Sequence, residues 1–392
     1  HADELGEQGF KLMIMDEAHY GKAGMSTAQG RSMIKLADLI PHVLLLTGTP
    51  IKNAVSELWP LLSSLQPDVW GKNKEDFRRK YSEVVGEGRR VREVGVNEER
   101  KHELKERLAC TMIRRLKSEA MPDLPPMQRQ PLVAKLTDDQ LKRYVYAADE
   151  FEKWFREQVQ IAIERQAAEQ GRGPDELTPD EIRAVNMAVA RSMRAKAIVK
   201  LGKLRQITGE AKADRMRPVI KALKKNGESA IFWAHHKNVV NTLKRMLEEE
   251  GVSWAAITGG VSNQERGEIA KDFQDGAIQV LIATTAAKEG LTLTRANRAY
   301  FVERYWTPAD EAQAEARIWR IGQTRPSTNY FLGVPRTIDE RVDEIIEGKR
   351  QVIDEVLGDE SIEKKFAEDL QDHIIMGLGY TGALTNPKKR RA

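Results

Sequence analysis

The tetrapeptide Asp16-Glu-Ala-His19 places two adjacent carboxylates directly after a short apolar run, residues 11–16. Such a run is typical of a buried parallel strand that brings its last residues to the C-terminal edge of a sheet, where α/β proteins bind ligands. Mg²⁺ prefers oxygen ligands and retains several waters, so Asp16 is predicted to hold this metal largely through water. Phosphoryl transfer to water requires an oriented nucleophile, and Glu17 is predicted to polarise it. A solvated helix start is the alternative, but the full tetrapeptide after a strand favours catalysis.

A second apolar run, residues 43–47, leads into the turn Thr47-Gly-Thr-Pro50. Hydroxyl groups in a glycine turn can hydrogen-bond the acidic pair if the two strands are neighbours, and so relay its state to another part of the protein. Alone, this tetrapeptide is an ordinary turn. Because Asp16 is expected at the neighbouring strand edge, a coupling role is predicted.

Two arginines near the C-terminal end stand in Gln313-x-x-x-Arg317-x-x-Arg320-Ile-Gly-Gln323. A spacing of three places them on one face of the helix predicted over 308–320. Guanidinium groups suit the charge spread over γ-phosphate oxygens, and an arginine finger contributes roughly 10³ to 10⁵ in rate. The alternative is a solvated basic face, but the spacing, the flanking proline and the terminal Ile-Gly-Gln favour the finger interpretation.

The elements that must position these residues follow from hydrophobic periodicity, which alternates clearly from Ser229 onward and predicts a parallel α/β domain. Helix-start signals at Ser262, Thr307 and Thr337 agree with this pattern. The expected elements are strand 230–234, helix 238–250, strand 254–257, helix 263–275, strand 279–284, strand 298–302, helix 308–320, strand 328–332 and helix 338–356.

The first 126 residues predict strand 11–16, helix 31–40 and strand 43–47, then a helical, aromatic-rich stretch over 54–115 with a charged loop at 86–95. Its candidate core residues are Trp59, Leu62, Leu65, Trp70, Phe77 and Tyr81.

Beyond a proline-rich linker near residue 124, a short strand is predicted over 132–136. Thr137-Asp-Asp-Gln140 is a capping-box pattern that opens a long helix, and a second helix is predicted from Thr178-Pro to about Ile207.

Composition excludes several classes of protein. With 41% hydrophobic and 31% charged residues, the 392-residue chain is predicted to form two compact globular units. It has no apolar run of the roughly 18 to 20 residues that a membrane helix needs. The net charge of +4, from 63 basic and 59 acidic residues, is too balanced to indicate a polyanion partner. The single cysteine, Cys110, excludes an intrachain disulfide and is expected to be a small buried hydrophobe. His235 and His236 lack ligand partners at metal spacing and are expected to be structural.

Several segments resemble, in family order, successive motifs of the superfamily 2 Swi/Snf ATPases. They are Asp16-Glu-Ala-His19, Leu46-Thr-Gly-Thr-Pro50, Glu57-Leu-Trp-Pro-Leu-Leu62, Lys288-Glu-Gly-Leu-Thr-Leu293, Trp306-x-Pro308 and Arg317-Ile-Trp-Arg-Ile-Gly-Gln323. The similarity is close over 11–126 and 229–357. Trp233-Ala-His-His-Lys-Asn-Val239 further resembles the annealing-helicase branch.

The resemblance implies ATP and Mg²⁺ as cofactors and a role for each matching residue, with Lys52 and Asn53 as weaker candidates. The implied catalytic residues are Asp16, which would also hold Mg²⁺, and Glu17, His19, Arg317 and Arg320. The implied ATP-binding and coupling residues are Thr47, Gly48, Thr49, Glu289, Gly290 and Gln323. The implied DNA-binding residues, some of them at a helix N-terminus suited to anions, are Gly259, Gly260, Ser262, Thr285 and Lys288.

One departure from the family concerns the phosphate loop. No Gly-x-x-x-x-Gly-Lys-Ser/Thr occurs, and fifteen residues precede Asp16, whereas the family's acidic motif follows that loop by many residues. We therefore expect an N-terminally truncated chain that by itself binds ATP poorly and is inactive.

The expected fold class is α/β, with tandem RecA-like lobes, the first incomplete, helical insertions and a C-terminal brace helix. The predicted domains are the end of lobe 1 (1–53), a helical protrusion and linker (54–126), a helical insertion of lobe 2 (127–215), the helicase C-terminal lobe (216–337), the brace helix (338–358) and a basic tail (359–392).

The function implied is ATP-dependent translocation on double-stranded DNA by a helicase-like Swi/Snf ATPase that remodels DNA or protein–DNA structures. Its expected partners are double-stranded or forked DNA and a DNA-bound protein, with no membrane, and the motor is expected to be monomeric. A cytoplasmic location of bacterial or phage type is expected, with the nucleus as the alternative. Two other functions stay open: a catalytically incomplete DNA-binding or interaction module, and a strand-separating helicase.

Overall fold

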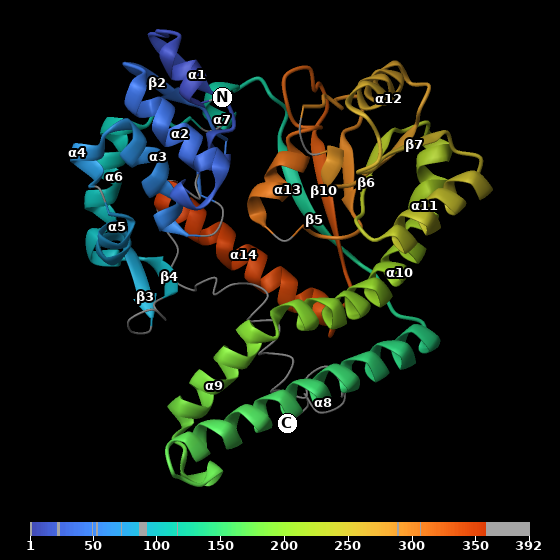
Figure 1. The fold of residues 1–392 in the computed structure, drawn as a ribbon. Coiled ribbons are helices and arrows are strands. Elements are labelled where there is room, and N and C mark those ends of the chain that lie inside the picture. The colour runs from blue at the N-terminus through green and yellow to red at the C-terminus, as the bar shows by residue number, and fades with distance from the viewer. Residues whose placement is uncertain are drawn as a thin grey trace. The chain divides into compact units, whose positions relative to one another are not determined.

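The computed structural model describes residues 2–21, 24–48, 50–51, 54–71, 73–85, 92–115, 117–287, 290–305 and 307–357 (Figure 1). The chain divides into two compact units. Among the described residues, the first contains those within 2–115, 307–309 and 345–357, and the second contains those within 117–305 and 310–344.

The first unit begins with two parallel strands joined by a helix. Its elements are α1 Ala2–Glu7, β1 Leu12–Met15, α2 Ala28–Leu39, β2 His42–Leu45, α3 Trp59–Leu65, α4 Pro67–Trp70, α5 Lys74–Tyr81, β3 Ser82–Val85, β4 Arg92–Val96 and α6 Lys101–Thr111. β1 pairs with β2 in parallel, which sets Met15 beside Leu45. The strand, helix and strand predicted here are confirmed, and both strands end where the candidate motifs begin.

The rest of the first unit packs around a separate core, in which the predicted residues Leu62, Trp70, Phe77 and Tyr81 are buried. Trp59 lies partly buried at its margin, and Leu65 is not among its residues. The expectation of a helical stretch over 54–115 with a loop at 86–95 is wrong for residues 82–85 and 92–96, because these form β3 and β4, which pair antiparallel.

A single side chain explains this hairpin. Glu93 on β4 accepts hydrogen bonds from Ser56 N at 3.0 Å and from Ser82 Oγ at 2.8 Å. Both partners lie far from it in the sequence, so helical periodicity gave no sign of the pairing. Residues 86–91 lie outside the described part of the chain.

The second unit contains a six-stranded sheet in which all neighbouring strands are parallel, in the order β5-β10-β9-β6-β8-β7. Its strands are β5 Met127–Val133, β6 Ala230–Trp233, β7 Trp254–Ile257, β8 Val280–Ala283, β9 Arg298–Phe301 and β10 Ser327–Gly333. Its helices are α7 Lys117–Ala120, α8 Asp138–Glu169, α9 Pro179–Ser192, α10 Arg194–Asn226, α11 Lys237–Glu249, α12 Asn263–Asp275, most of α13 Pro308–Glu315 and the start of α14 Ile338–Leu357.

Both faces of this sheet are covered. Phe232 points into a core shared with α10 and α11, whereas its neighbours Ile231 and Trp233 point into a core shared with α12 and α13. Alternate residues of one strand therefore serve opposite layers. The α/β class predicted from the sequence is confirmed.

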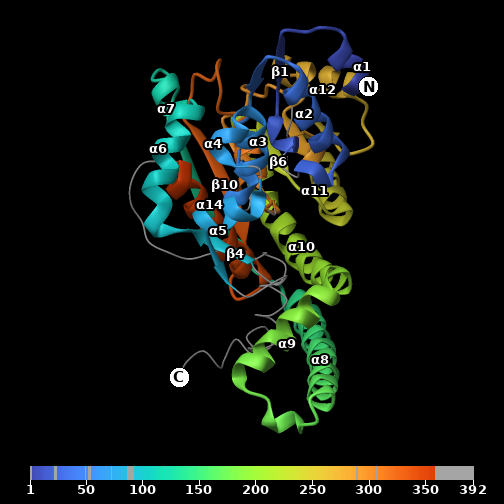
Figure 2. The same ribbon diagram turned by 60° about the vertical axis from the view of Figure 1, so that its left-hand side comes forward.

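In the second unit, α8, α9 and the first part of α10 stand apart from the sheet as a helical insertion, whereas the last part of α10 packs on the sheet (Figures 1 and 2). α8 begins with the predicted capping box between Thr137 and Gln140. The single helix predicted to end near Ile207 is wrong, because the helix breaks at Met193 and α10 then continues to Asn226. Burial of Met216 and Ile220 in the sheet core stabilises the last turns of α10.

The strand predicted over 132–136 is also displaced, since β5 covers Met127–Val133 and pairs in parallel with β10. It contains Pro131, which is tolerated because β5 is the edge strand of the sheet and needs hydrogen bonds on one side only. The proline weakened the strand signal where the strand in fact lies.

Cys110 is exposed, so the expectation of a buried thiol is wrong. On α6 the inward face is formed by Leu104 and Leu108, which are spaced by four residues and leave Cys110 outside. Among the described residues, no helix combines the length and apolar character that crossing a membrane requires.

Candidate functional site

The acidic motif forms a tight turn at the end of β1. Glu17 has a φ of +50°, a left-handed conformation that few residues with a side chain adopt. Its amide donates to Asp16 Oδ1 at 2.8 Å, and the next amide, that of Ala18, donates to the carbonyl of Leu46 at 2.9 Å. The turn is therefore fixed to the segment that follows β2, and unusual backbone of this kind is often found at functional sites.

His19 connects the acidic motif with the threonine turn. It is almost fully buried, and its Nδ1 lies 2.9 Å from Glu17 Oε2 and 3.2 Å from Thr47 Oγ1. The structure thus places the two motifs in contact through the imidazole, which the threonine hydroxyl approaches. Gly48 follows as an exposed residue, and Thr49, Lys52 and Asn53 lie outside the described residues.

The exposed carboxylate of Asp16 fits the predicted magnesium role. Within the described ranges, no three His, Cys, Asp or Glu side chains are grouped so as to enclose a metal ion. Mg²⁺ does not require such a cage, because it usually takes one or two carboxylates and completes its shell with water and substrate phosphates. A single carboxylate next to a strand end suits that mode.

In the second unit the predicted DNA-binding residues lie at the C-terminal edge of the sheet. β7 and β8 end in register, with Ile257 beside Ala283, so Gly259, Gly260 and Thr285 follow neighbouring strand ends and are exposed. Lys288 and Glu289 lie outside the described residues. Gly290 has a φ of +73°, which favours glycine at that position.

Ser262 is the N-cap of α12, and its donor and acceptor groups are both engaged. Its hydroxyl accepts from Glu265 N at 3.3 Å, while its own amide donates to Glu265 Oε2 at 2.9 Å. These bonds from Ser262 hold the pKa of Glu265 below its usual range. A DNA phosphate that bound here would have to displace the Glu265 carboxylate from the helix N-terminus.

The two candidate finger arginines do not lie on a helix. α13 ends at Glu315, so the helix predicted to reach 320 is wrong. Glu315 is held by paired bonds of 2.6 Å from Arg129 of β5, and the carbonyl of Arg317 accepts from Leu293 N at 3.0 Å. These contacts, remote in sequence, replace the last helical turn.

The structure nevertheless brings the arginines together. Arg317 Nη1 and Arg320 Nη1 each donate to the carbonyl of Leu291, both at 3.0 Å. Arg317 Nε also donates to the Gln313 carbonyl at 3.0 Å. Two guanidinium groups thus converge on one oxygen atom in the motif that ends at Leu293.

Gln323 is buried, and its side chain fixes the local backbone. Its Nε2 donates to the carbonyls of Thr294, Ala296 and Ile318 at 2.9 to 3.0 Å. Its Oε1 accepts the amides of the two residues that follow it. The ATP-coupling role predicted for Gln323 stays a prediction, and this contact set shows that it holds the loop behind the arginines.

Sequence reasoning missed a buried charge network after β9. Glu303 is 1% exposed and accepts from the amides of His235 and His236 at 2.7 and 2.9 Å. Burial is the largest single influence and opposes its ionisation, but the hydrogen bond from His236 together with attraction to His236, Lys212 and His235 holds the pKa of Glu303 below its usual range. Burial lowers the pKa of His235 to about 4, so its ring is neutral near pH 7.

The next residue, Arg304, extends the network in the other direction. It donates to Glu311 of α13 at 2.7 and 2.8 Å and to Asp343 of α14 at 2.9 Å. Its carbonyl accepts from Arg205 of α10 at 2.8 Å. A charged pair directly after a buried strand, the same signal as Asp16-Glu17, could have identified these residues.

Two family models match the chain. The SNF2-related domain covers residues 1–199, and the helicase conserved C-terminal domain covers residues 211–322. The chain is 28% identical over 356 residues to the human DNA annealing helicase and endonuclease ZRANB3, covering 89% of this chain and 30% of that protein. It is 28% identical over 351 residues to the SWI/SNF-related matrix-associated actin-dependent regulator of chromatin subfamily A-like protein 1 of Xenopus laevis, covering 88% and 32%.

Among solved structures, the Sulfolobus solfataricus SWI2/SNF2 ATPase core in complex with dsDNA matches with a TM-score of 0.44 and 22% identity, covering 90% of this chain and 70% of that one.

The SNF2-related and helicase conserved C-terminal models together identify helicase-like ATPase domains. Because the SNF2-related model covers half of the chain, the chain belongs to the SNF2-related family, a Swi/Snf-type branch of superfamily 2. It spans about 30% of the length of the curated relatives it matches.

Proposed function

We propose that this chain carries the ATP-hydrolysing machinery of a motor that moves along double-stranded DNA and remodels DNA or protein–DNA structures. The observation that carries the proposal is the contact chain from Glu17 through His19 to Thr47, which links a water-activating carboxylate to a second motif. Family membership supports ATP hydrolysis. The name of the relative ZRANB3, a DNA annealing helicase, supports DNA as the partner.

In this proposal each residue has a task set by its chemistry. Asp16 holds Mg²⁺ largely through its waters, and the bound ion neutralises charge on the phosphates of ATP. Glu17 orients the attacking water, and His19 transmits the state of Glu17 to Thr47. Arg317 and Arg320 stabilise the charge that develops on the phosphate, for which they exchange their bonds to the Leu291 carbonyl.

The test uses Glu17→Gln in the longest reading frame that contains these residues. DNA-stimulated ATP hydrolysis is expected to fall by at least about 100-fold, because an oriented proton acceptor contributes about 10² to 10⁴ in rate. Duplex binding should persist. The matched control is Glu7→Gln, an equally conservative change at an exposed position of the same unit. Unaltered turnover in Glu17→Gln would defeat the assignment.

Two assays separate the proposed translocase from its alternatives. A translocase displaces a third strand from a triplex in an ATP-dependent manner but does not separate a blunt duplex. A strand-separating helicase does unwind that duplex. A DNA-binding module without motor activity binds duplex and shows neither reaction. Forked DNA, tested as a competitor of blunt duplex, shows which of the two DNA forms is preferred.

The remaining parts of the proposal concern the cellular setting. We propose a monomeric motor that meets a DNA-bound protein partner in the cytoplasm, with the nucleus as the alternative. Light scattering measures the mass in solution, and a fluorescent fusion shows the location. A stable dimer would contradict the first point, and nuclear accumulation would select the alternative.

A further inference from the structure

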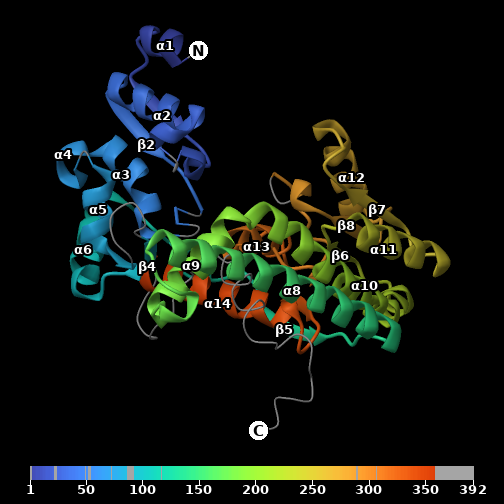
Figure 3. The same ribbon diagram turned by 60° about the horizontal axis from the view of Figure 1, so that its bottom comes forward.

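The helical insertion of the second unit contains a groove between α8 and α10. The two helices lie side by side and run in opposite directions (Figures 1 and 3), since Gln140 of α8 bonds Asp214 of α10 at 3.0 Å while Trp154 of α8 lies under Lys200, with Nζ 5.5 Å from the ring centre. None of the Swi/Snf motifs falls in this insertion. Its surface is therefore not explained by the proposed catalytic cycle.

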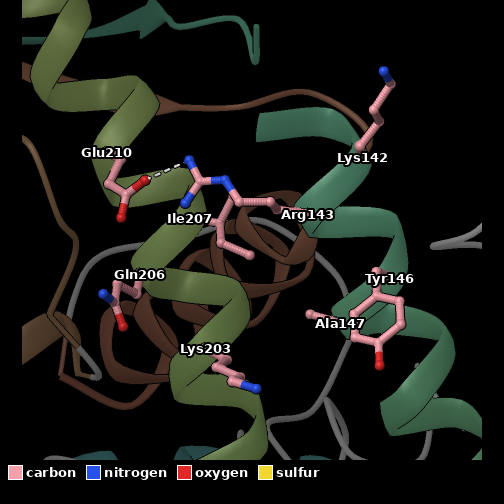
Figure 4. A pocket seen from close by; sticks show the side chains of 8 residues that line it. All are labelled: Lys142, Arg143, Tyr146, Ala147, Lys203, Gln206, Ile207 and Glu210. Carbon is pink, nitrogen blue, oxygen red and sulfur yellow. Dashed lines mark hydrogen bonds and ion pairs between the residues drawn. The ribbon is translucent and has the colours of Figure 1, made fainter. Parts of the chain in front are cut away.

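A cavity of about 470 Å³ opens in this groove. Figure 4 shows the side chains from the two helices that line it, with the bond from Arg143 to Glu210, 2.8 Å long, joining them at one end. Ala147 and Ile207 form the apolar part of the lining. The other lining residues are Lys142, Tyr146, Lys203 and Gln206.

A row of lysines continues from this cavity along α10. Lys196, Lys200 and Lys203 are spaced by four and three residues, so they share one helix face and span about 10 Å along the axis. Across the groove, α8 contributes Lys142 and Lys153. Among the residues that the structure describes, none of the five has an acidic partner, and all but the half-buried Lys200 are exposed.

The lack of acidic partners for these lysines contrasts with the rest of α10. α10 carries eleven Lys or Arg against two Asp or Glu. Toward its C-terminal end the chain supplies acids to match, since Arg217 pairs with Glu249 at 2.7 Å and Lys221 lies 3.7 Å from Glu250. Among the described residues, Lys196, Lys200 and Lys203 in its N-terminal half have no such acidic partner, so their charge is available to an external anion.

We propose that this lysine groove, comprising Lys142, Lys153, Lys196, Lys200 and Lys203, binds the phosphate backbone of duplex DNA. The inference rests on the proposed function and adds to it a DNA contact outside the helicase motifs. Lysines recurring at about 5 Å along a helix form a row of positive charge whose spacing is of the same order as that of the phosphates, which carry one charge per about 3.4 Å on each strand. Contacts of this kind position a duplex without reading its sequence.

An acidic polypeptide is the competing occupant, and the groove suits it less well. Such a partner normally anchors through large apolar side chains. Here the apolar lining is limited to Ala147 and Ile207 beside the ring of Tyr146, which is 65% exposed. The charged row extends well beyond that lining, which favours a long, uniformly charged ligand.

The experiment compares two charge-matched variants of the 392-residue chain. The groove variant changes three lysines to glutamine: Lys142→Gln, Lys200→Gln and Lys203→Gln. The control variant does the same near the other end of α10: Lys221→Gln, Lys224→Gln and Lys225→Gln. Binding to a labelled 30-base-pair duplex is followed by fluorescence anisotropy between 50 and 200 mM salt.

The groove variant is expected to bind the duplex more than tenfold more weakly at 50 mM salt. The slope of log K against log salt should fall in magnitude by about 2.7, since each lost phosphate contact removes about 0.9. The control should retain both values. An arginine version of the groove variant preserves the charge and should restore binding. An unchanged slope, an equal loss in the control, or no rescue by arginine would each overturn the proposal.

A second probe, polyglutamate, distinguishes the competing occupant. If the groove variant loses polyglutamate binding and retains duplex binding, the surface belongs to an acidic polypeptide and the DNA proposal is wrong. The motor assignment is tested separately by hydrolysis in Glu17→Gln. If the groove variant loses DNA binding but Glu17→Gln hydrolyses ATP normally, the groove proposal is supported and the motor assignment is wrong. If the unaltered chain does not bind duplex at 50 mM salt, the groove proposal falls, while the motor assignment is still decided by hydrolysis in Glu17→Gln.

Discussion

The parallel strands of the two units have similar sequences and very different surroundings. In the second unit, every residue of β6 and β8 is buried, and Ile231 and Leu281 are 0% exposed. In the first unit, residues of β1 and β2 alternate between exposed and half-buried, and Ile14 and Leu44 are 58% and 52% exposed. An apolar strand on its own therefore does not establish a covered sheet, because burial depends on the layers that the chain supplies.

This difference extends to how each unit holds its candidate site. In the first unit, Glu17 and His19 lie beside a small core of Ala18, Met33 and Leu61, and His19 contacts Glu17 and Thr47. In the second unit, Glu303 and Arg304 are fixed by bonds to three helices, α10, α13 and α14, and to the segment that precedes α11. We expect the first unit to open at lower denaturant concentration, as followed by hydrogen exchange of peptides from each unit in a urea series.

The largest single effect is expected from breaking the buried ion network. Arg304→Met removes the partner of Glu311, which is 0% exposed, and should destabilise the second unit by about 3 to 5 kcal/mol. Arg245→Met, in an exposed pair with Glu249, should cost less than about 1 kcal/mol. Amide hydrogen-exchange rates in the first unit should be unchanged by either substitution. Equal destabilisation of both units by Arg304→Met would contradict the difference drawn between them.

The parts of this site that could be predicted are those set by local sequence. The capping boxes at Thr137 and Ser262 involve residues three apart, and they were identified correctly. The end of α13 and the Arg304 network depend on partners that are distant in sequence, such as Arg129 for Glu315 and Arg205 for the Arg304 carbonyl. Periodicity contains no information about such pairs.

The same distinction, between local sequence signals and contacts of residues distant in sequence, applies to the site in the first unit. The positions of Asp16 and Thr47 followed from apolar runs that end at the sheet edge. That His19 lies between Glu17 and Thr47, and that Glu17 is left-handed, depends on how the turn closes over the second strand. These features were not predictable from residue types alone.

His235 should give a pH effect on the stability of the second unit that is similar in size to the effect of Arg304→Met. Burial lowers its pKa to about 4 from the ordinary 6.5, so the unfolded chain takes up a proton that the folded one does not. This contribution to stability is fully present above pH 6.5 and is lost as the pH falls toward 4, by about 3 kcal/mol. Urea unfolding of the second unit at several pH values measures it. His235→Phe, which can pack against Tyr305, should lack this part of the slope, and a slope unchanged by the substitution would remove His235 as its source.

A steric test addresses the first unit alone. A methyl group added at Gly30 in α2 would lie 2.0 Å from the carbonyl oxygen of Gly24, so Gly30→Ala should destabilise this unit by about 1 to 3 kcal/mol. Gly267, also inside a helix, has no atoms within 4 Å of the added methyl group. Gly267→Ala should therefore stabilise α12 of the second unit by about 0.5 to 1 kcal/mol. If both substitutions had the same sign, the close approach at Gly30 would not be what holds α2 in place.

The smallest effect is expected on the open face of the first sheet. Ile14→Thr removes little buried apolar surface, so it should change the stability of the 392-residue chain by less than about 0.5 kcal/mol. Ile231→Thr in the second sheet should cost several times more, because the side chain is fully buried and its hydroxyl finds no water. Urea titrations of both variants measure the two changes in the free energy of unfolding, which can then be compared. The same pair of substitutions made in a longer reading frame adds information, since a larger cost for Ile14→Thr there would show that additional sequence covers this face. A large cost in the 392-residue chain itself would mean that Ile14 is already covered, and the contrast between the two sheets would then not hold.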